Sequence, residues 1–364
     1  MNINTEFFKF IFLSFLFSCL VTSFAISSVV FIGDIVEYAK KLSDYSDNNF
    51  LLLIQLGTLN LPKMLMEILP FSFLFGGMLW TIRVTKNREL LIMRTSGLSL
   101  LRISIPIFIS SFLTGIIFLF IFSPLVSATQ KKIQKIELEK LGKPINSLLV
   151  SKSGFWLKQG HEEGSEIIYA KKLKTKSMTL EDVVIFSFDS MNKIDKKIQA
   201  FSAKLKDNYW LLQNTRIINN NGEVSNEKQL LIRTTVTSSQ IREGFATPET
   251  VSLWSLYSFI RMFEKAGFSA DKHRLHLYKL FFFPLLLSGM AVLGISFNMN
   301  TVTRKPLNHS LFYMIIIGFV IFYFTKLISA LAISGKIGLI LSAFLPSVLP
   351  IFFALLFIIQ ADEK

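Results

Sequence analysis

Long apolar segments place the strongest limit on how this chain can fold. Residues 10–33 form a run of 24 residues without a charged side chain, and residues 103–130 form a second run of 28. An α-helix rises 1.5 Å per residue, so about 20 apolar residues cross the hydrocarbon core of a bilayer. Both runs are therefore predicted to be transmembrane helices.

Further apolar runs bring the expected number of spans to six. They cover residues about 62–82, 280–303, 307–325 and 337–361. The chain is 51% hydrophobic with a mean hydropathy of +0.49, which excludes a water-soluble domain of this size. Proline is favoured in the first turn of a helix, so the second span is expected to begin at Pro62. The first run is too long for a signal-peptide core, so it is expected to remain as a helix.

A strongly basic segment, residues 83–102, separates the second span from the third. Its charged residues are Arg83, Lys86, Arg88, Arg94 and Arg102, against the single acid Glu89. Lys and Arg near span ends favour the cytoplasmic side of a membrane. With six spans, both termini are then expected in the cytoplasm.

The middle of this segment, about residues 86–97, is predicted to form a short helix. It is rich in helix formers, with Asn87 as a candidate N-cap and Gly97 as a natural stop. An apolar side is expected from Leu90, Leu91 and Met93. Two interpretations stay open: a helix that a cytoplasmic partner binds, or an interfacial helix that only joins two spans.

Residues 131–272 are polar and contain no run long enough to span a membrane. Short apolar or alternating runs at 154–158, 183–188 and 203–212 are separated by Gly and Asn residues, which predicts a β sandwich or open barrel. The spacing from Leu253 to Phe263 predicts one helix, ended by Gly267. The expected organisation is spans 1–3 in residues 1–130, an external β domain in 131–272, and spans 4–6 in 273–364.

The sequence lacks the motifs of common catalytic sites. We find no phosphate-binding loop, no Gly-x-Ser-x-Gly elbow and no HExxH. The single cysteine, Cys19, excludes an intramolecular disulfide, and His273 with His276 is better explained as an interfacial pair than as a metal site. We therefore expect no metal and no cofactor. A membrane protein of this kind is most simply a transporter subunit or a receptor.

The net charge of +14 indicates an anionic partner. Because the basic residues are interleaved with apolar spans and no nucleic-acid motif is present, acidic lipids fit better than nucleic acid. Lys63 and Glu67 lie one helical turn apart within the second span. Such residues either face a cavity or pair with each other at the headgroup level.

Two stretches, residues 60–77 and 88–97, resemble the LptF/LptG lipopolysaccharide-export permease family. Residues 283–290 and 342–346 resemble LptG more than LptF. The resemblance covers all six spans, is most specific at 60–97, and in the β domain is limited to residues 207–212. It implies a polytopic α-helical membrane protein with a periplasmic β-jellyroll-like domain between helices 3 and 4.

The resemblance also implies partners. Family members pair as an LptF–LptG heterodimer with two copies of the ATPase LptB and the single-span protein LptC. The complex extracts lipopolysaccharide from the bacterial inner membrane and passes it through periplasmic domains towards LptA. ATP hydrolysis would belong to the ATPase partner, so this chain is not expected to be an enzyme.

Carried over by position, the resemblance implies two sets of site residues. The set that couples to the ATPase is Glu89, Arg94 and Gly97. The set that contacts lipid phosphates is Lys63, Lys131, Lys132, Lys135, Lys40 and Lys41. In the β domain, Phe186 and Phe188 are expected to face an apolar groove for acyl chains.

Two alternative functions are left open by the sequence. One is a permease subunit of another lipid or lipoprotein ABC exporter, although lipoprotein-releasing subunits usually carry the outer domain after the first span. The other is a membrane-anchored scaffold whose β domain only docks partners. Co-purification of an ATPase separates transport from a scaffold, and the identity of bound lipid separates the two permeases.

Overall fold

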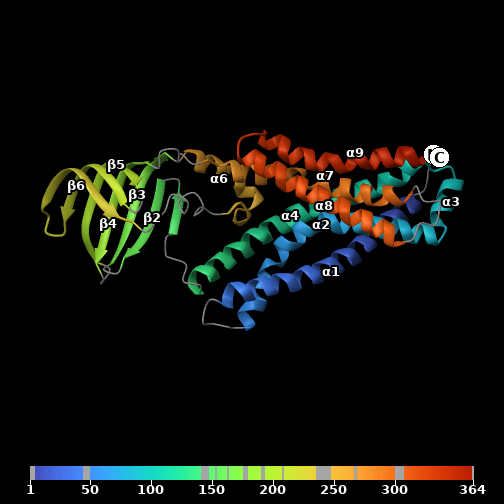
Figure 1. Cartoon of the computed structure of the whole chain (residues 1–364), viewed down its shortest axis with the longest axis horizontal. Coiled ribbons are helices and arrows are strands. Elements are labelled where there is room, and N and C mark those ends of the chain that lie inside the picture. The colour runs from blue at the N-terminus through green and yellow to red at the C-terminus, as the bar shows by residue number, and fades with distance from the viewer. Residues whose placement is uncertain are drawn as a thin grey trace. The chain divides into compact units, whose positions relative to one another are not determined.

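The computed structural model separates the chain into two compact units, Met1–Ile133 with Arg274–Lys364, and Gln134–His273 (Figure 1). We call them the membrane unit and the β unit and describe each by itself. The structure describes residues 5–43, 50–140, 147–151, 154–161, 164–174, 179–189, 193–206, 209–234, 247–265, 269–299 and 307–362.

The membrane unit is built from long helices. They are α1 (Thr5–Ser43), α2 (Phe50–Lys86), α4 (Leu100–Lys140), α7 (Asp271–Met299), α8 (Leu307–Ile333) and α9 (Leu339–Asp362). In the part of the chain that the structure describes, these six helices are long and apolar enough to cross a membrane, which confirms the expected number of spans. A further, short helix, α3 (Glu89–Thr95), lies between α2 and α4.

The first helix continues past the apolar run that predicted it. Asp34, Glu37 and Lys40 follow the apolar run of residues 10–33, where the sequence predicts a short polar connection. All three lie within α1, so this prediction is wrong for them. The following residues, including Asp44 and Asp47, lie outside the described residues. Charged side chains near a span end reach the headgroup region, so a helix does not have to stop where the apolar run stops.

The second helix begins earlier than expected. Pro62 lies inside α2, which starts at Phe50, and Pro70 follows it in the same helix. The prediction that Pro62 marks the first turn is therefore wrong. Proline is tolerated in membrane helices because neighbouring helices and side chains satisfy the backbone groups that it leaves free.

Two helices, α2 and α7, form the centre of the membrane unit. In their most apolar stretches 56% of α2 and 72% of α7 is buried, against 17% of α1 and 28% of α8. Glycines bring the two backbones together: Gly294 packs on Leu74, and a Cβ on Gly77 would lie 2.8 Å from the carbonyl oxygen of Ala291. Small residues at helix contacts are typical of membrane bundles, where close packing drives association.

One face of α1 packs against α2. Ile11, Phe15 and Cys19 are buried there, and the Trp80 Nε1–H of α2 donates to Ser14 Oγ at 2.8 Å. The Thr22 hydroxyl donates to the Ser72 carbonyl oxygen at 2.9 Å. These polar contacts hold α1 in a fixed register on α2.

The β unit contains a seven-stranded antiparallel sheet in the order β1-β2-β3-β4-β5-β6-β7. The strands are β1 (Ser147–Ser151), β2 (Gly154–His161), β3 (Gly164–Lys174), β4 (Thr179–Asp189), β5 (Ile194–Lys206), β6 (Tyr209–Asn219) and β7 (Val224–Arg233). The expected antiparallel β domain is confirmed. Each strand pairs with the next one in sequence, so the described strands form a meander, which refines the jellyroll-like expectation.

Strand β4 contains a backbone irregularity at Asp182. Asp182 adopts a left-handed φ of 54° and interrupts the ladder, so Leu180, Val183 and Ile185 are buried on one face. The pairing register with β3 and β5 is the same before and after Asp182, so it is the local backbone that changes which side chains are buried, from Leu180 to Val183 and Ile185. Phe186 and Phe188 are partly buried and lie on the strand face opposite Val183 and Ile185; that they line an apolar groove stays a prediction.

A helix, α6 (Leu253–Lys265), follows a short 3-10 turn at Pro248–Thr250. Its buried residues, Leu256, Ile260 and Phe263, have the spacing that predicted it; Gly267 lies outside the described residues. The His273 ring, in the first turn of α7, lies 5.0 Å from the Phe259 ring and 5.3 Å from the Phe263 ring. The His273 ring is therefore packed against aromatic side chains. No group of three His, Cys, Asp or Glu side chains that could hold a metal ion exists among the described residues.

Candidate functional site

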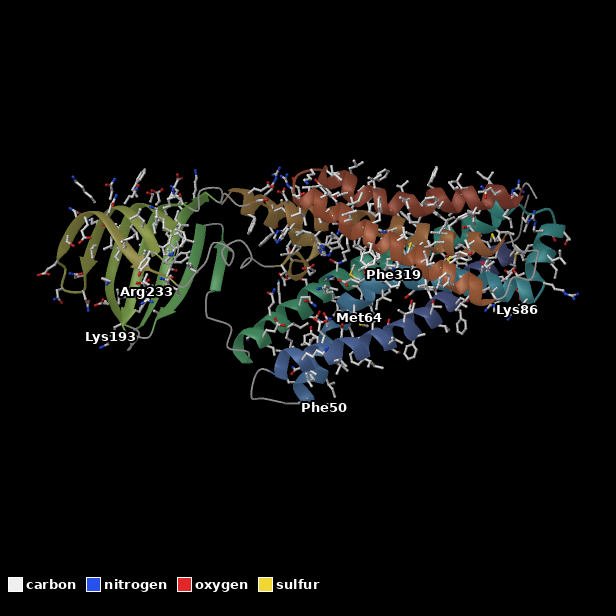
Figure 2. All side chains as sticks on the ribbon, in the orientation of Figure 1. Phe50, Met64, Lys86, Lys193, Arg233 and Phe319 are labelled. Carbon is white, nitrogen blue, oxygen red and sulfur yellow. The ribbon has the colours of Figure 1, made fainter. Side chains whose placement is uncertain are left out.

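The predicted site residues lie toward two ends of the membrane unit. Figure 1 shows α3 at one end, beside the C-terminal end of α9, and the adjoining ends of α1 and α2 at the opposite end. Figure 2 shows Lys86 at the α3 end and Phe50 at the other. The residues expected to contact an ATPase are thus separated from Lys40 and Lys63, which lie in the parts of α1 and α2 near the opposite end.

Helix α3 has an anchored side and an exposed side. Leu90 and Met93 are buried in the core of the membrane unit, whereas Leu91 is 60% exposed and Ile92 62% exposed. The prediction of a short helix is confirmed, but Leu91 does not share a face with Leu90 and Met93. Large apolar side chains exposed outside the long spans are suited to contact with another protein.

The two ends of α3 are set by backbone geometry. Gly97 has φ 81°, and its N–H donates to the Arg94 carbonyl oxygen at 2.9 Å, while the Leu98 N–H donates to the Met93 carbonyl oxygen at 3.3 Å. This pair of bonds is a Schellman motif, so the prediction of Gly97 as the stop is confirmed. At the other end Arg88 takes the N-cap position with φ 61°. The prediction that Asn87 is the N-cap is wrong.

The Asn87 side chain contacts Glu89 instead. Its Nδ2 donates to Glu89 Oε1 at 3.0 Å, which holds the carboxylate near the start of α3. The other carboxylate oxygen, Oε2, is shielded from water and has no hydrogen-bond partner among the described residues. A carboxylate oxygen in that state is unfavourable unless a donor reaches it. Glu89 is therefore held at the start of α3 through one oxygen, while its other oxygen lacks a donor among the described residues.

Arg94 contacts a residue that the sequence did not indicate. Its Nη2 lies 3.6 Å from Oδ1 of Asp362, at the C-terminal end of α9. The same oxygen accepts the backbone N–H of Leu100, the first residue of α4, at 3.2 Å. The only signal in the sequence was an acid directly after the last apolar run, and no local spacing relates it to Arg94.

Lys63 is half-buried within α2, and Glu67 is exposed. No ion pair joins them in the described part of the chain. One turn before Lys63, Asn60 donates to Asp34 Oδ2 at 2.8 Å and accepts from Gln130 Nε2 at 2.9 Å. This Asp34–Asn60–Gln130 chain joins α1, α2 and α4 next to Lys63.

The other predicted lysines lie on the surfaces of α1 and α4. Lys40 is exposed on α1, and Lys131, Lys132 and Lys135 are exposed on α4, directly after Gln130. Lys41 belongs to α1, but its side chain lies outside the described residues. The polar chain thus brings Lys63 and Lys131 onto neighbouring helices, whereas Lys135 belongs to the β unit.

Comparison with known proteins agrees with this architecture. A family model described as the lipopolysaccharide export system permease LptF/LptG matches residues 9–360. The lipopolysaccharide export system permease protein LptG of Haemophilus influenzae is 22% identical over 297 residues, which covers 80% of this chain and 81% of that protein. LptG of Escherichia coli K12 is 19% identical over 297 residues, covering 79% of this chain and 80% of the relative. The match extends over all six spans and the β unit, and the chain therefore belongs to the LptF/LptG family of lipopolysaccharide export permeases.

Proposed function

We propose that this chain is the LptG-type permease subunit of an ABC transporter that extracts lipopolysaccharide from the bacterial inner membrane. The proposal is supported by the family match over residues 9–360 and by two relatives named as LptG. The expected partners are an LptF-type permease, an LptB-type ATPase dimer, LptC and the periplasmic LptA bridge. ATP is hydrolysed by the ATPase, and this chain supplies the membrane path.

The basic flanks of α3 support an orientation. Arg83, Lys86 and Arg102 border this helix, and such residues near short loops favour the cytoplasm. We infer that α3 and both termini are cytoplasmic and that the β unit is periplasmic. In this orientation the β unit receives lipid from the membrane unit.

The observation that carries the proposal is the exposed side of α3. Leu91 and Ile92 project outward from a helix that Leu90 and Met93 fix in the core, and Glu89 lies at the start of this helix. We infer that the ATPase binds this side. Glu89 accepts a hydrogen bond from the ATPase, Arg94 transmits motion into the membrane unit, and Gly97 ends the helix so that its exposed side keeps its direction.

The test is co-purification of the ATPase with Glu89 variants. Glu89→Ala removes the acceptor and is expected to weaken assembly and export. Glu89→Lys is expected to be worse, because repulsion is added to the lost contact. Glu6→Lys is the matched control: Glu6 is an exposed acid in the first turn of α1, in an i,i+3 pair with Lys9. If Glu89→Ala left assembly and export intact, the coupling role would be wrong.

The apolar contact is tested separately. Replacing Ile92, which is 62% exposed, with Ser is expected to lower ATPase co-purification without lowering the melting temperature of the permease. Leu90→Ser, on the buried side of the same helix, is expected to lower both. An Ile92→Ser variant that binds the ATPase normally would favour the interpretation of α3 as a mere connector between spans.

At the opposite end, we infer that Lys63, with Lys131, Lys132, Lys135, Lys40 and Lys41, contacts lipopolysaccharide phosphates. A charge-assisted contact contributes roughly 1.5–3 kcal/mol, so Lys63→Ala should weaken lipid binding by about tenfold or more. Because Lys63 and Glu67 are not paired in the described structure, the melting temperature should not change. Lys63→Arg should retain much of the binding, and Lys336→Ala, at an exposed turn between α8 and α9, is the control.

A further inference from the structure

We infer that Asp362 is a positioning residue that connects the coupling helix α3 to the last span, α9. The inference rests on the proposed function, in which α3 receives motion from the ATPase. Asp362 belongs to α9 and not to α3, and it contacts Arg94 from there. Its role is to transmit displacement of α3, and it has no part in ATPase binding.

One carboxylate oxygen of Asp362 makes two contacts. Asp362 Oδ1 lies 3.6 Å from Arg94 Nη2 and 3.2 Å from the Leu100 backbone nitrogen. The first N–H groups of a helix lack partners within the helix, and Leu100 is the first residue of α4. A carboxylate at that position also interacts favourably with the helix dipole. Asp362 therefore caps α4 and holds α3 at the same time.

The surroundings of the Arg94–Asp362 ion pair restrict the movement of both side chains. The side chains of Arg94 and Asp362 are only 35% and 25% exposed. Their neighbours in sequence, Met93 and Ala361, are buried in the same core, together with Leu100. Arg94 also lies inside the Schellman motif that ends at Gly97, so it cannot move without the rest of α3. A displacement of the exposed side of α3 is therefore carried to α9.

Helix α9 passes this displacement to the centre of the membrane unit. It contains Pro346 and Pro350, which remove backbone hydrogen bonds and permit bending. A Cβ on Gly289 of α7 would lie 2.8 Å from the Ile351 side chain, so α9 and α7 are in close contact there. The path from α3 through Asp362 thus ends on the most buried span.

The experiment is a double-mutant cycle on the whole complex in proteoliposomes, measuring lipopolysaccharide released per ATP hydrolysed. Asp362→Asn keeps an oxygen for the Leu100 N–H and removes the charge that attracts Arg94. We expect ATPase co-purification and melting temperature to be retained, and the transport ratio to fall by about threefold or more. Asp362→Glu, which keeps the charge, should retain most of the transport ratio of the unmodified complex. Glu6→Gln should leave this ratio unchanged.

The second arm uses Arg94→Gln alone and combined with Asp362→Asn. If the two residues act through their pair, the double variant should lose no more than the worse single variant. Losses that multiply, or an unchanged ratio in Asp362→Asn, would overturn the inference. Failure of the proposed function looks different: Glu89→Ala would then leave assembly and export intact, whatever the Asp362 variants do.

Discussion

Two spans of similar hydropathy, α7 and α1, have opposite surroundings. Helix α7 is buried over 72% of its most apolar stretch, and α1 over 17%. The buried surface of α7 includes Gly289 and Gly294, which leave space for neighbouring helices. The outer surface of α1 carries large side chains such as Phe17 and Phe24, the latter 78% exposed.

The comparison shows that hydropathy indicates whether a helix lies in the membrane, but does not indicate whether it lies at the centre or at the surface of the bundle. Lipid tails are as apolar as Leu, so exposure of Phe24 to lipid has little cost. A helix enters the centre when its small residues allow close packing and its hydroxyls, such as Ser288 donating to the Pro284 carbonyl oxygen at 3.0 Å, are satisfied internally. Residue size therefore distinguishes the two spans better than apolarity.

The largest effect is expected for Gly294→Leu. Its first side-chain atom would overlap the backbone of Leu74 on α2, which cannot move away. Overpacking costs typically 1–3 kcal/mol, and we expect more than about 3 kcal/mol here because backbone atoms are involved. Size-exclusion chromatography in detergent should show little folded protein. Gly33→Leu in α1 is the control, since no described atom lies within 4 Å of its added Cβ; equal yields would contradict the comparison.

A smaller effect is expected within α1 itself. Phe15 is buried against Phe73 and Trp80, with ring centroids 5.9 and 6.3 Å away. Phe15→Ala leaves a cavity and should cost about 2–3 kcal/mol, below the usual range for soluble cores because lipid removes the transfer contribution. The melting temperature in detergent measures the change. Phe24→Ala, on the exposed face, should change stability by less than about 0.5 kcal/mol; a similar loss in both variants would mean that α1 packs through a different face.

Asn60→Leu should have an intermediate effect. It removes both hydrogen bonds of the Asp34–Asn60–Gln130 chain. Interhelical hydrogen bonds in membranes contribute on average about 0.6 kcal/mol each, so a loss of about 1–2 kcal/mol is expected once the unpaired Asp34 is included. Thr58→Ala is the control, because the Thr58 hydroxyl donates within its own helix, to the Ile54 carbonyl oxygen. An unchanged melting temperature for Asn60→Leu would show that the chain does not hold α1 in place.

The smallest effect is expected for Gly97→Ala. No described atom lies within 4 Å of the added Cβ, so the cost comes from the backbone at φ 81° alone. That cost is about 1 kcal/mol. Thermal unfolding should shift slightly, and Gly97→Asn, which tolerates this conformation better, should shift it less. A loss as large as that of Gly294→Leu would mean that the end of α3 is more tightly packed than the structure shows.

The sequence predicted the number of spans well, because an uncharged apolar run of about 20 residues is rarely stable anywhere except across a bilayer. Helix ends were predicted poorly, since Asp34 and Lys40 continue α1 and Pro62 lies inside α2. The centre of the bundle was not predicted at all. Gly77 and Gly294 were visible as small residues, but their partners follow only from the packing.

In the β unit the strands were predictable and one face was not. The run from Val183 to Phe188 is apolar at almost every position, so alternation alone could not show that Val183 and Ile185 face the core of the β unit. At the α3 end, Gly97 followed from local rules. Asp362 did not, because 262 residues separate it from Leu100, whose N–H it accepts.

This separation has a consequence for the synthesis of the protein. Helix α3 and the start of α4 leave the ribosome before Asp362, which follows Leu100 by 262 residues. At 5–20 residues per second, 262 residues correspond to on the order of 10–50 s during which the Leu100 N–H has no access to Asp362. Until Asp362 has been added, α3 also lacks the ion pair between Arg94 and Asp362. The contact that joins α3 to α9 can therefore form only after the end of α9 has been synthesised.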